Sequence, residues 1–125
     1  MLTPNDYQKE AARTDPCATT ADILRATESA EQVNVPQLLN ACVGLSGETG
    51  EFNELVKKYV FHKAQFDIEH AKKELGDVCW YLAQACNALG VQLGEVMQLN
   101  VDKLRKRYPE GFDEWRANHK EPGDV

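Results

Sequence analysis

The clearest helical signal in the chain lies in two stretches, GLSGETGEFNE at residues 44–54 and KKELGDVCWYL at residues 72–82. Around the first, from about residue 36 to 63, apolar residues recur every three to four positions: Leu38, Leu39, Cys42, Leu45, Phe52, Val56 and Tyr59. Around the second, between a capping Asp67 and a terminating Gly90, they form a stripe: Leu75, Val78, Cys79, Leu82, Ala85, Cys86 and Leu89. This spacing places the apolar side chains on one face, so each stretch predicts an amphipathic helix.

Three further helices are predicted on either side of these two, at about residues 4–13, 20–32 and 93–107. Capping residues mark the starts of the first two, and the sequence YPEG marks the end of the third. No segment shows the alternation of a β-strand, so we expect an all-α fold, an antiparallel bundle of four to five helices. We expect one domain over residues 1–112 and a polar C-terminal tail over residues 113–125.

Composition and charge narrow the classes of function. The chain has 125 residues, which suits a single domain with its own core. Its 20 acidic and 14 basic residues give a net charge of −6, which argues against a non-specific nucleic-acid binder because such proteins need a basic face. No run of 18 apolar residues is present, so no membrane span is expected. The N-terminus lacks the apolar centre of a signal peptide, and we therefore expect a cytoplasmic location.

Acidic residues lie beside the apolar stripes of both central helices. Glu48 and Glu51 are three residues apart and share a helix face, and Glu74 and Asp77 repeat this spacing on the next helix. If the helices pack through their stripes, the four carboxylates converge. Two carboxylates about 4 Å apart repel by roughly 4 kcal/mol at an effective dielectric constant near 20. The cluster therefore predicts raised pKa values or a bound divalent cation, and oxygen ligands favour Mg²⁺ or Mn²⁺.

A simpler interpretation exists for each acidic pair taken alone. Glu-x-x-Glu is common on solvated helix faces, where acids form ion pairs with lysines one turn away, and Glu54 with Lys58 fits that description. Helical glycines also have two interpretations, because a missing side chain allows close approach either of another helix or of a ligand. Four glycines fall in the two central helices: Gly44, Gly47, Gly50 and Gly76.

The helix predicted at residues 93–107 carries positive charges opposite in sign to the acidic cluster. Asn100, Lys103 and Arg107 share one stripe of it, and Asn100 is flanked by apolar residues, so we expect its amide to be half-buried and to need a partner. Lys103 and Arg107 suit phosphate oxygens. The alternative is that cations in the last turn of a helix only complement its dipole.

Two aromatic residues, Trp80 and Tyr81, lie about one turn after Asp77. An aromatic ring at this position can stack on a nucleotide base or form a hydrogen bond to a phosphate. Packing in the core or at an interface is the alternative interpretation.

Together these motifs resemble the signature of MazG-like nucleotide pyrophosphohydrolases, a group within the all-α NTP pyrophosphatase superfamily. That signature is Glu-x-x-Glu on one helix followed by Glu-x-x-Asp on the next, matched here by Glu48–Glu51 and Glu74–Asp77. The surrounding sequences GLSGETGE, KKELGDVCWYLA and NVDKLRKRYPEGF are similar as well. The resemblance covers about residues 38–112 and is strongest to stand-alone, single-domain members found in bacteria and phages.

The resemblance implies hydrolysis of a nucleoside triphosphate, or its deoxy form, to the monophosphate and pyrophosphate. The biological role would be control of the nucleotide pool, directed at dGTP or dATP in a phage setting. It also implies Mg²⁺ or Mn²⁺, with two or more ions per site, and a homodimer or homotetramer with sites at subunit contacts.

By the same resemblance, each candidate residue receives a role. Glu48, Glu51, Glu74 and Asp77 hold the metal ions, and Glu48 and Glu51 are the catalytic carboxylates. Glu51 orients or deprotonates the attacking water. The substrate-binding candidates are Asn100 and Lys103 at the phosphates, with Tyr81, Trp80 and Arg107.

Two other classes of function compete with this one. A ferritin-like di-iron bundle needs Glu-x-x-His pairs, and none of His62, His70 and His119 has a glutamate three residues before it. A non-catalytic helical interaction module that retains the fold is the second alternative. Its stability would not respond to metal or nucleotide.

Overall fold

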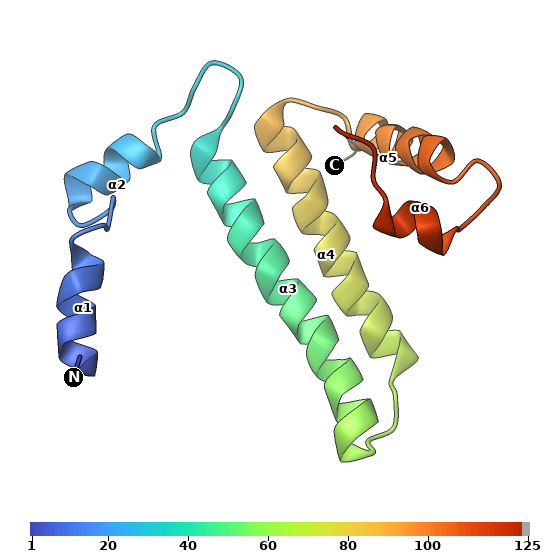
Figure 1. Ribbon diagram of the computed structural model, residues 1–125, viewed down its shortest axis with the longest axis horizontal. Helices are drawn as coiled ribbons and strands as arrows, with labels where there is room; N and C mark the ends of the chain where they lie inside the picture. Colours follow the sequence, from blue (N-terminus) through green and yellow to red (C-terminus); the bar gives the residue numbers. More distant parts are fainter. Residues whose placement is uncertain (124–125) are drawn as a thin grey trace.

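The computed structural model describes residues 1–123, and this part of the chain folds into six helices without a named strand (Figure 1). The all-α prediction is therefore confirmed. The helices are α1 (Pro4–Ala12), α2 (Thr20–Ala26), α3 (Val35–His62), α4 (Ile68–Leu89), α5 (Leu93–Arg107) and α6 (Glu114–Asn118). No helix within residues 1–123 combines the length and apolar character needed to cross a membrane.

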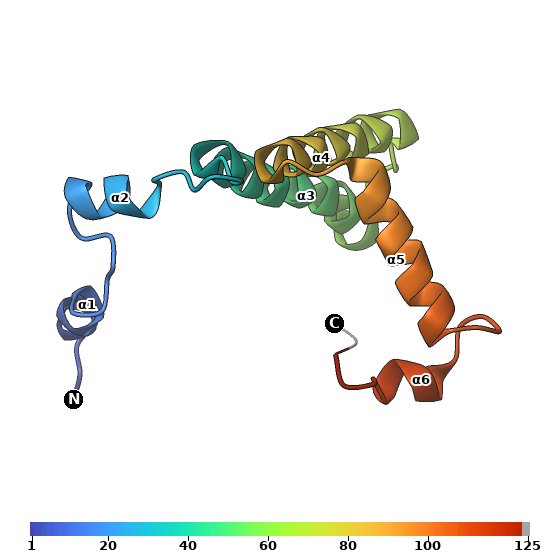
Figure 2. The ribbon, with the colours of Figure 1, turned by 90° about the horizontal axis from the view of Figure 1, so that it is seen from above.

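The two longest helices, α3 and α4, lie side by side as an antiparallel hairpin in both ribbon views (Figures 1 and 2). Local chemistry sets their ends. The Asn34 side chain accepts a hydrogen bond from the Gln37 N–H at the start of α3, and Asp67 accepts one from the His70 N–H at the start of α4. Gly90 ends α4 with φ 66°, the left-handed conformation that glycine adopts without strain.

The register of this hairpin depends on one close contact. A Cβ built on Gly44 of α3 would lie 2.0 Å from Cε1 of Tyr81, so the ring of Tyr81 occupies the space that a side chain would fill. Towards the N-terminus of α3, the Gln37 amide nitrogen lies 3.4 Å from Oε1 of Gln84. Towards the other end of the hairpin, the same register carries Glu48 of α3 to the level of Asp77 on α4.

The segment between α2 and α3 differs from the prediction. Helix α2 ends at Ala26, not near residue 32, because the backbone that follows makes other hydrogen bonds. Ala30 and Val33 form an isolated antiparallel bridge, and the N–H of Asn34 donates to the carbonyl of Ala88 at 2.9 Å. This bond fastens the start of α3 to the last turn of α4.

The segment predicted as a polar C-terminal tail contains the short helix α6 behind an Asp113 cap. The Asp113 side chain accepts from the N–H of Arg116 at 2.8 Å, which satisfies one of the open donors of the first turn. Residues 124 and 125 of the predicted tail lie outside the described residues.

A single chain buries little. The buried apolar residues are Ala41, Ala71, Cys86 and Ala88, all on the hairpin. Helices α1 and α2 form an arm on one side of the hairpin, and α5 leaves the end of α4 at a steep angle (Figure 2). Large apolar side chains such as Phe61, Leu99 and Trp115 are more than half exposed. The hairpin is thus the packed centre of the protomer.

We expect Gly44→Ala to destabilise the protein by about 1–3 kcal/mol, because the new methyl group collides with the Tyr81 ring. Gly47, one turn further along α3, is the matched control, because a Cβ added there would have nothing within 4 Å. Gly47→Ala is expected to be neutral or to stabilise by up to about 1 kcal/mol through helix propensity. Urea unfolding at fixed protein concentration measures both, and equal destabilisation would contradict the packing assigned to Gly44.

Candidate metal centre

Three carboxylates meet at the contact between α3 and α4. Glu48 of α3 and Glu74 and Asp77 of α4 each place one carboxylate oxygen within 4.8 Å of the other two. Glu48 and Glu74 are half-buried and Asp77 is exposed, so the group sits at the edge of the helix contact. The hairpin therefore brings Glu48 to two acids that lie 26 and 29 positions further along the sequence.

Burial and the neighbouring acids change the pKa of Glu48. Its pKa is raised, first by burial and then by the negative charges of Asp77, Glu74 and Glu51. A hydrogen bond with the Glu74 side chain, which needs a proton between two carboxyl groups, raises the pKa further. In the absence of a cation, Glu48 thus holds a proton to a higher pH than an ordinary glutamate does.

Glu51 stands apart from this group of three. It is exposed on α3, one turn beyond Glu48, and is not among the oxygens that lie within 4.8 Å of one another. Its charge nevertheless contributes to the raised pKa of Glu48. The structure places Glu51 at the rim of the centre rather than among its closest oxygens.

Three lysines close in sequence to the centre form ion pairs with other acids. Lys57 and Lys58 lie 2.8 Å and 3.8 Å from the carboxylate of Glu54, as the spacing of Glu54 and Lys58 predicts. Lys72 lies 3.0 Å from Glu69. These pairs occupy helix faces beside the centre and leave its negative charge in place.

The donor set fits a hard divalent cation. All three groups offer oxygen, which Mg²⁺ and Mn²⁺ prefer over nitrogen or sulfur. Oxygens on one octahedral ion with bonds of about 2.1 Å lie roughly 3–4.2 Å apart, so small side-chain rotations would close the observed spacing. Glu48, Glu74 and Asp77 therefore suit an ion that water would complete.

A histidine that the sequence motifs do not include lies beside this centre. The ring nitrogen Nε2 of His70 is 2.7 Å from Oε1 of Glu74, one helical turn along α4. The i,i+4 spacing of the two residues was the available sequence signal.

The candidate phosphate-binding residues lie on α5, away from the carboxylates of the same chain. Asn100 and Lys103 line a pocket of about 280 Å³ together with Val96 and Leu99. Figure 2 shows α5 projecting from the hairpin, and among the described helices it packs mainly against α4. Asn100 is exposed, so the expectation of a half-buried amide is wrong: the apolar residues beside it are themselves uncovered in one chain.

Arg107, at the end of α5, places its guanidinium carbon 5.9 Å from the centre of the Tyr108 ring. This cation–π contact orients the side chain along the last turn of the helix.

The aromatic candidates divide into two environments. Tyr81 packs against Gly44, so helix packing accounts for its position. Trp80 meets the Tyr81 ring edge to face, with ring centres 4.9 Å apart, and the residue is 53% exposed. Trp80 is therefore the aromatic ring of this pair that a bound base could still reach.

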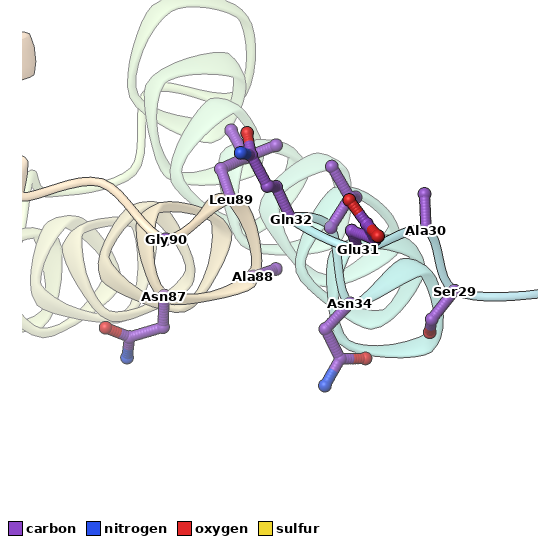
Figure 3. Close-up of a pocket in the computed structure, with 10 residues that line it drawn as sticks. Ser29, Ala30, Glu31, Gln32, Asn34, Asn87, Ala88, Leu89 and Gly90 are labelled. Atoms are coloured by element: carbon purple, nitrogen blue, oxygen red, sulfur yellow. The ribbon is translucent and has the colours of Figure 1, made fainter.

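A larger pocket of about 660 Å³ lies at the open end of the hairpin, where the loop before α3 meets the end of α4 (Figure 3). Its polar groups include Asn34, Asn87 and Gln32. Asn34 precedes Glu48 by about 21 Å of helix at 1.5 Å per residue, which separates this pocket from the carboxylates.

Replacing Glu48 by Gln tests the electrostatics of the centre. Because its pKa is raised, the folded state holds the Glu48 proton more tightly than the unfolded chain, so wild-type stability falls as pH rises above the ordinary glutamate value. Metal-free Glu48→Gln cannot ionise there, and we expect its Tm to fall less between pH 4.5 and 7.5 than that of the wild type. Thermal melts across this pH range provide the measurement.

The same melts with Mn²⁺ at pH 7.5 test the cation. At about 100 times the dissociation constant, binding stabilises by about 2.7 kcal/mol, roughly 10 °C for a chain of this size. We expect less than half of this shift in Glu48→Gln and the full shift in the control Glu54→Gln, whose carboxylate is paired with lysines. An unchanged wild-type Tm would argue against the metal centre.

Comparison with known proteins relates the sequence to a phage protein and to a family of domains. The chain is 42% identical over 73 residues to the Gene 37 protein of Mycobacterium phage L5, which covers 55% of this chain and 64% of that protein. The chain thus spans less than two thirds of the length of this relative. No solved structure matches the chain. The family model of the MazG nucleotide pyrophosphohydrolase domain matches residues 37–112, which contain the whole α3–α4 hairpin beyond Pro36, and the chain belongs to this family.

Proposed function

We propose that this protein hydrolyses a nucleoside or deoxynucleoside triphosphate to the monophosphate and pyrophosphate, with Mg²⁺ or Mn²⁺ as cofactor. One observation carries the proposal: Glu48, Glu74 and Asp77 converge within the segment that matches the MazG domain. An acidic cluster alone would repel a triphosphate, so the same groups need divalent cations both to stay ionised and to receive the substrate.

The reaction breaks one phosphoanhydride bond. A water oxygen attacks the α-phosphorus, the bond from that phosphorus to the bridging oxygen breaks, and pyrophosphate leaves with the bond electrons. When bound, the divalent cations supply Lewis acidity and neutralise charge on the phosphate oxygens. We assign their retention to Glu48, Glu51, Glu74 and Asp77, with two or more ions per site.

Glu51 is the better candidate for general base. It sits at the rim of the centre and is exposed, so its carboxylate is free to turn towards a water molecule on the substrate side. The proton released by the attacking water passes to this carboxylate. Glu48 is the second catalytic carboxylate in this proposal. It lies at the contact between α3 and α4, where its pKa is raised, and it holds and orients the reacting groups.

The phosphate contacts come from α5 in this proposal. Asn100 offers amide donors, and Lys103 and Arg107 offer positive charge to the leaving pyrophosphate. Since α5 points away from the carboxylates of its own chain, a second copy of the protein would supply these groups to the site.

The surface area of one chain supports such an assembly. Its accessible surface is 10415 Å², whereas a compact monomer of 14.0 kDa exposes about 6,700 Å². The excess of roughly 3,700 Å² per chain, or about 7,400 Å² for two chains, is larger than the roughly 2,000–5,000 Å² in total that obligate homodimers typically bury. We therefore propose a homodimer or homotetramer in which α5 of one copy faces the hairpin of another.

The biological role that we propose is control of the nucleotide pool, with dGTP or dATP as the favoured substrate in a phage setting. Similarity to a protein of Mycobacterium phage L5 supports that setting. The exposed ring of Trp80 is our candidate for stacking on the base, with Tyr81 behind it.

The activity is tested by incubating the protein with each NTP and dNTP plus Mg²⁺ or Mn²⁺ and identifying the products by ³¹P NMR. We expect monophosphate and pyrophosphate, and Glu74→Ala is expected to lower kcat at least about a thousandfold because it removes one of the two half-buried carboxylates of the centre. Glu54→Ala, whose carboxylate is paired with Lys57 and not with the centre, is the control and should keep wild-type turnover. A stable wild-type protein without turnover on any nucleotide would favour a non-catalytic interaction module.

Mixing two inactive variants tests the shared site. If α5 acts on the partner copy, Glu74→Ala and Lys103→Ala subunits that exchange in a dimer will regenerate intact sites in the mixed dimers, about a quarter of all sites. Activity of the mixture well above that of either variant is the expected result, and light scattering should give at least twice the protomer mass. Absence of recovery despite proven subunit exchange would place Lys103 and the carboxylates in one chain.

A further inference from the structure

We propose that His70 is a positioning residue of the metal centre, donating a hydrogen bond from Nε2–H to Oε1 of Glu74 and thereby fixing the direction in which this carboxylate faces its cation. This inference rests on the proposed function, because it assumes that the carboxylate group binds a divalent metal. The sequence motif it defines is Asp67, His70, Glu74 and Asp77, at intervals of three, four and three residues along one side of α4.

The geometry of the contact is short and well anchored. Nε2 of His70 and Oε1 of Glu74 lie 2.7 Å apart, a distance typical of a strong hydrogen bond to a carboxylate. The backbone of His70 is itself held, because its N–H donates to Oδ1 of Asp67 at 2.9 Å. Two hydrogen bonds thus connect the Asp67 cap to His70 and the His70 imidazole to Glu74, which belongs to the candidate metal centre.

The burial of Glu74 distinguishes this contact from a surface ion pair. Its side chain is only 14% exposed, whereas the Glu54 and Glu69 side chains in lysine pairs are 41% and 77% exposed. Exposed pairs contribute little because both partners remain solvated and mobile. At Glu74 the contact limits the rotation of a half-buried carboxylate that also belongs to the group of three.

The chemistry leaves room for both interactions. A carboxylate has two oxygens with about four acceptor positions, so Glu74 can accept the imidazole N–H and still offer oxygen to a cation. Hydrogen bonds of this kind orient the ligands of metal sites, and removing one typically lowers metal affinity 10–100-fold. The His70 nitrogens are not within the group of mutually close ligand atoms, which assigns His70 to the support of a ligand rather than to direct ligation.

The test compares His70→Leu, which removes the donor, with His70→Gln, whose amide nitrogen can take the place of Nε2. His62→Leu, at the end of α3, is the matched control for loss of an exposed histidine. Binding of Mn²⁺ without nucleotide is measured by electron paramagnetic resonance at constant pH. We expect affinity about 10–100-fold weaker in His70→Leu, within about threefold of wild type in His70→Gln, and unchanged in His62→Leu.

Three outcomes would overturn the inference. The first is wild-type Mn²⁺ affinity in His70→Leu, and the second is failure of His70→Gln to restore it when both variants melt like the metal-free wild type. The third is nitrogen hyperfine coupling of a directly coordinated imidazole in the wild-type Mn²⁺ spectrum that disappears in His70→Leu. The Mn²⁺-binding measurement contains no nucleotide, so it tests the role of His70 separately from hydrolysis. A protein that binds Mn²⁺ as expected but hydrolyses no nucleotide would contradict the proposed function and not this inference.

Discussion

Mutual repulsion among the carboxylates at the α3–α4 contact is the constraint on which the rest of this structure depends. Glu48 and Glu74 are half-buried where the helices meet, and the hairpin cannot separate them without losing its register. Burial first, and the neighbouring negative charges second, raise the pKa of Glu48, and protonation of this residue relieves the repulsion. A divalent cation bound as proposed would relieve the repulsion while the carboxylates stay ionised.

That register is set by contacts which carry no charge. Gly44 admits the ring of Tyr81, and the Asn34 N–H bonded to the carbonyl of Ala88 fixes the far end of the hairpin. A displacement of α4 by one turn, about 5.4 Å, towards the N-terminus of α3 would bring the Tyr81 ring to the level of Asn40 and Ala41, which carry side chains. A displacement in either direction would carry Asp77 away from Glu48. Packing at a glycine therefore determines the separation of acids one helical turn away.

The sequence predicted the hairpin well because its signals are local. The Asp67 cap, the Gly90 stop and the periodic apolar residues each act within a few positions, and the structure has both helix ends where these residues put them. Residues 27–33 were harder to predict, because the chain that follows them bonds to Ala88, more than fifty positions away. Helix α6 depends on a single Asp113 cap in an otherwise polar segment, which gives too little periodicity to detect.

The candidate site was predictable to the extent that helix faces determine it. Spacing placed Glu48 with Glu51 and Glu74 with Asp77, but faces alone do not give distances across the contact, so the rim position of Glu51 required the structure. The acidic motifs do not include His70, because they contain only the candidate metal ligands. His70 instead contacts an oxygen of one such candidate, Glu74. The environment of Asn100 depends on what covers α5, which intrachain patterns do not encode.

Helix α5 exposes apolar residues that a partner could cover, and the acidic hairpin concentrates negative charge that cations could balance. The hairpin concentrates negative charge that metal ions would offset only in part, while Lys103 and Arg107 stand on a helix whose apolar neighbours, such as Leu99, are left exposed. In the proposed assembly, burying those apolar residues against a second copy would also bring the cations towards the substrate phosphates. Metal affinity would then belong to the hairpin of one chain, whereas triphosphate affinity would require two. Subunit association would thereby control substrate binding more strongly than metal binding, because only the substrate needs both kinds of charge at once.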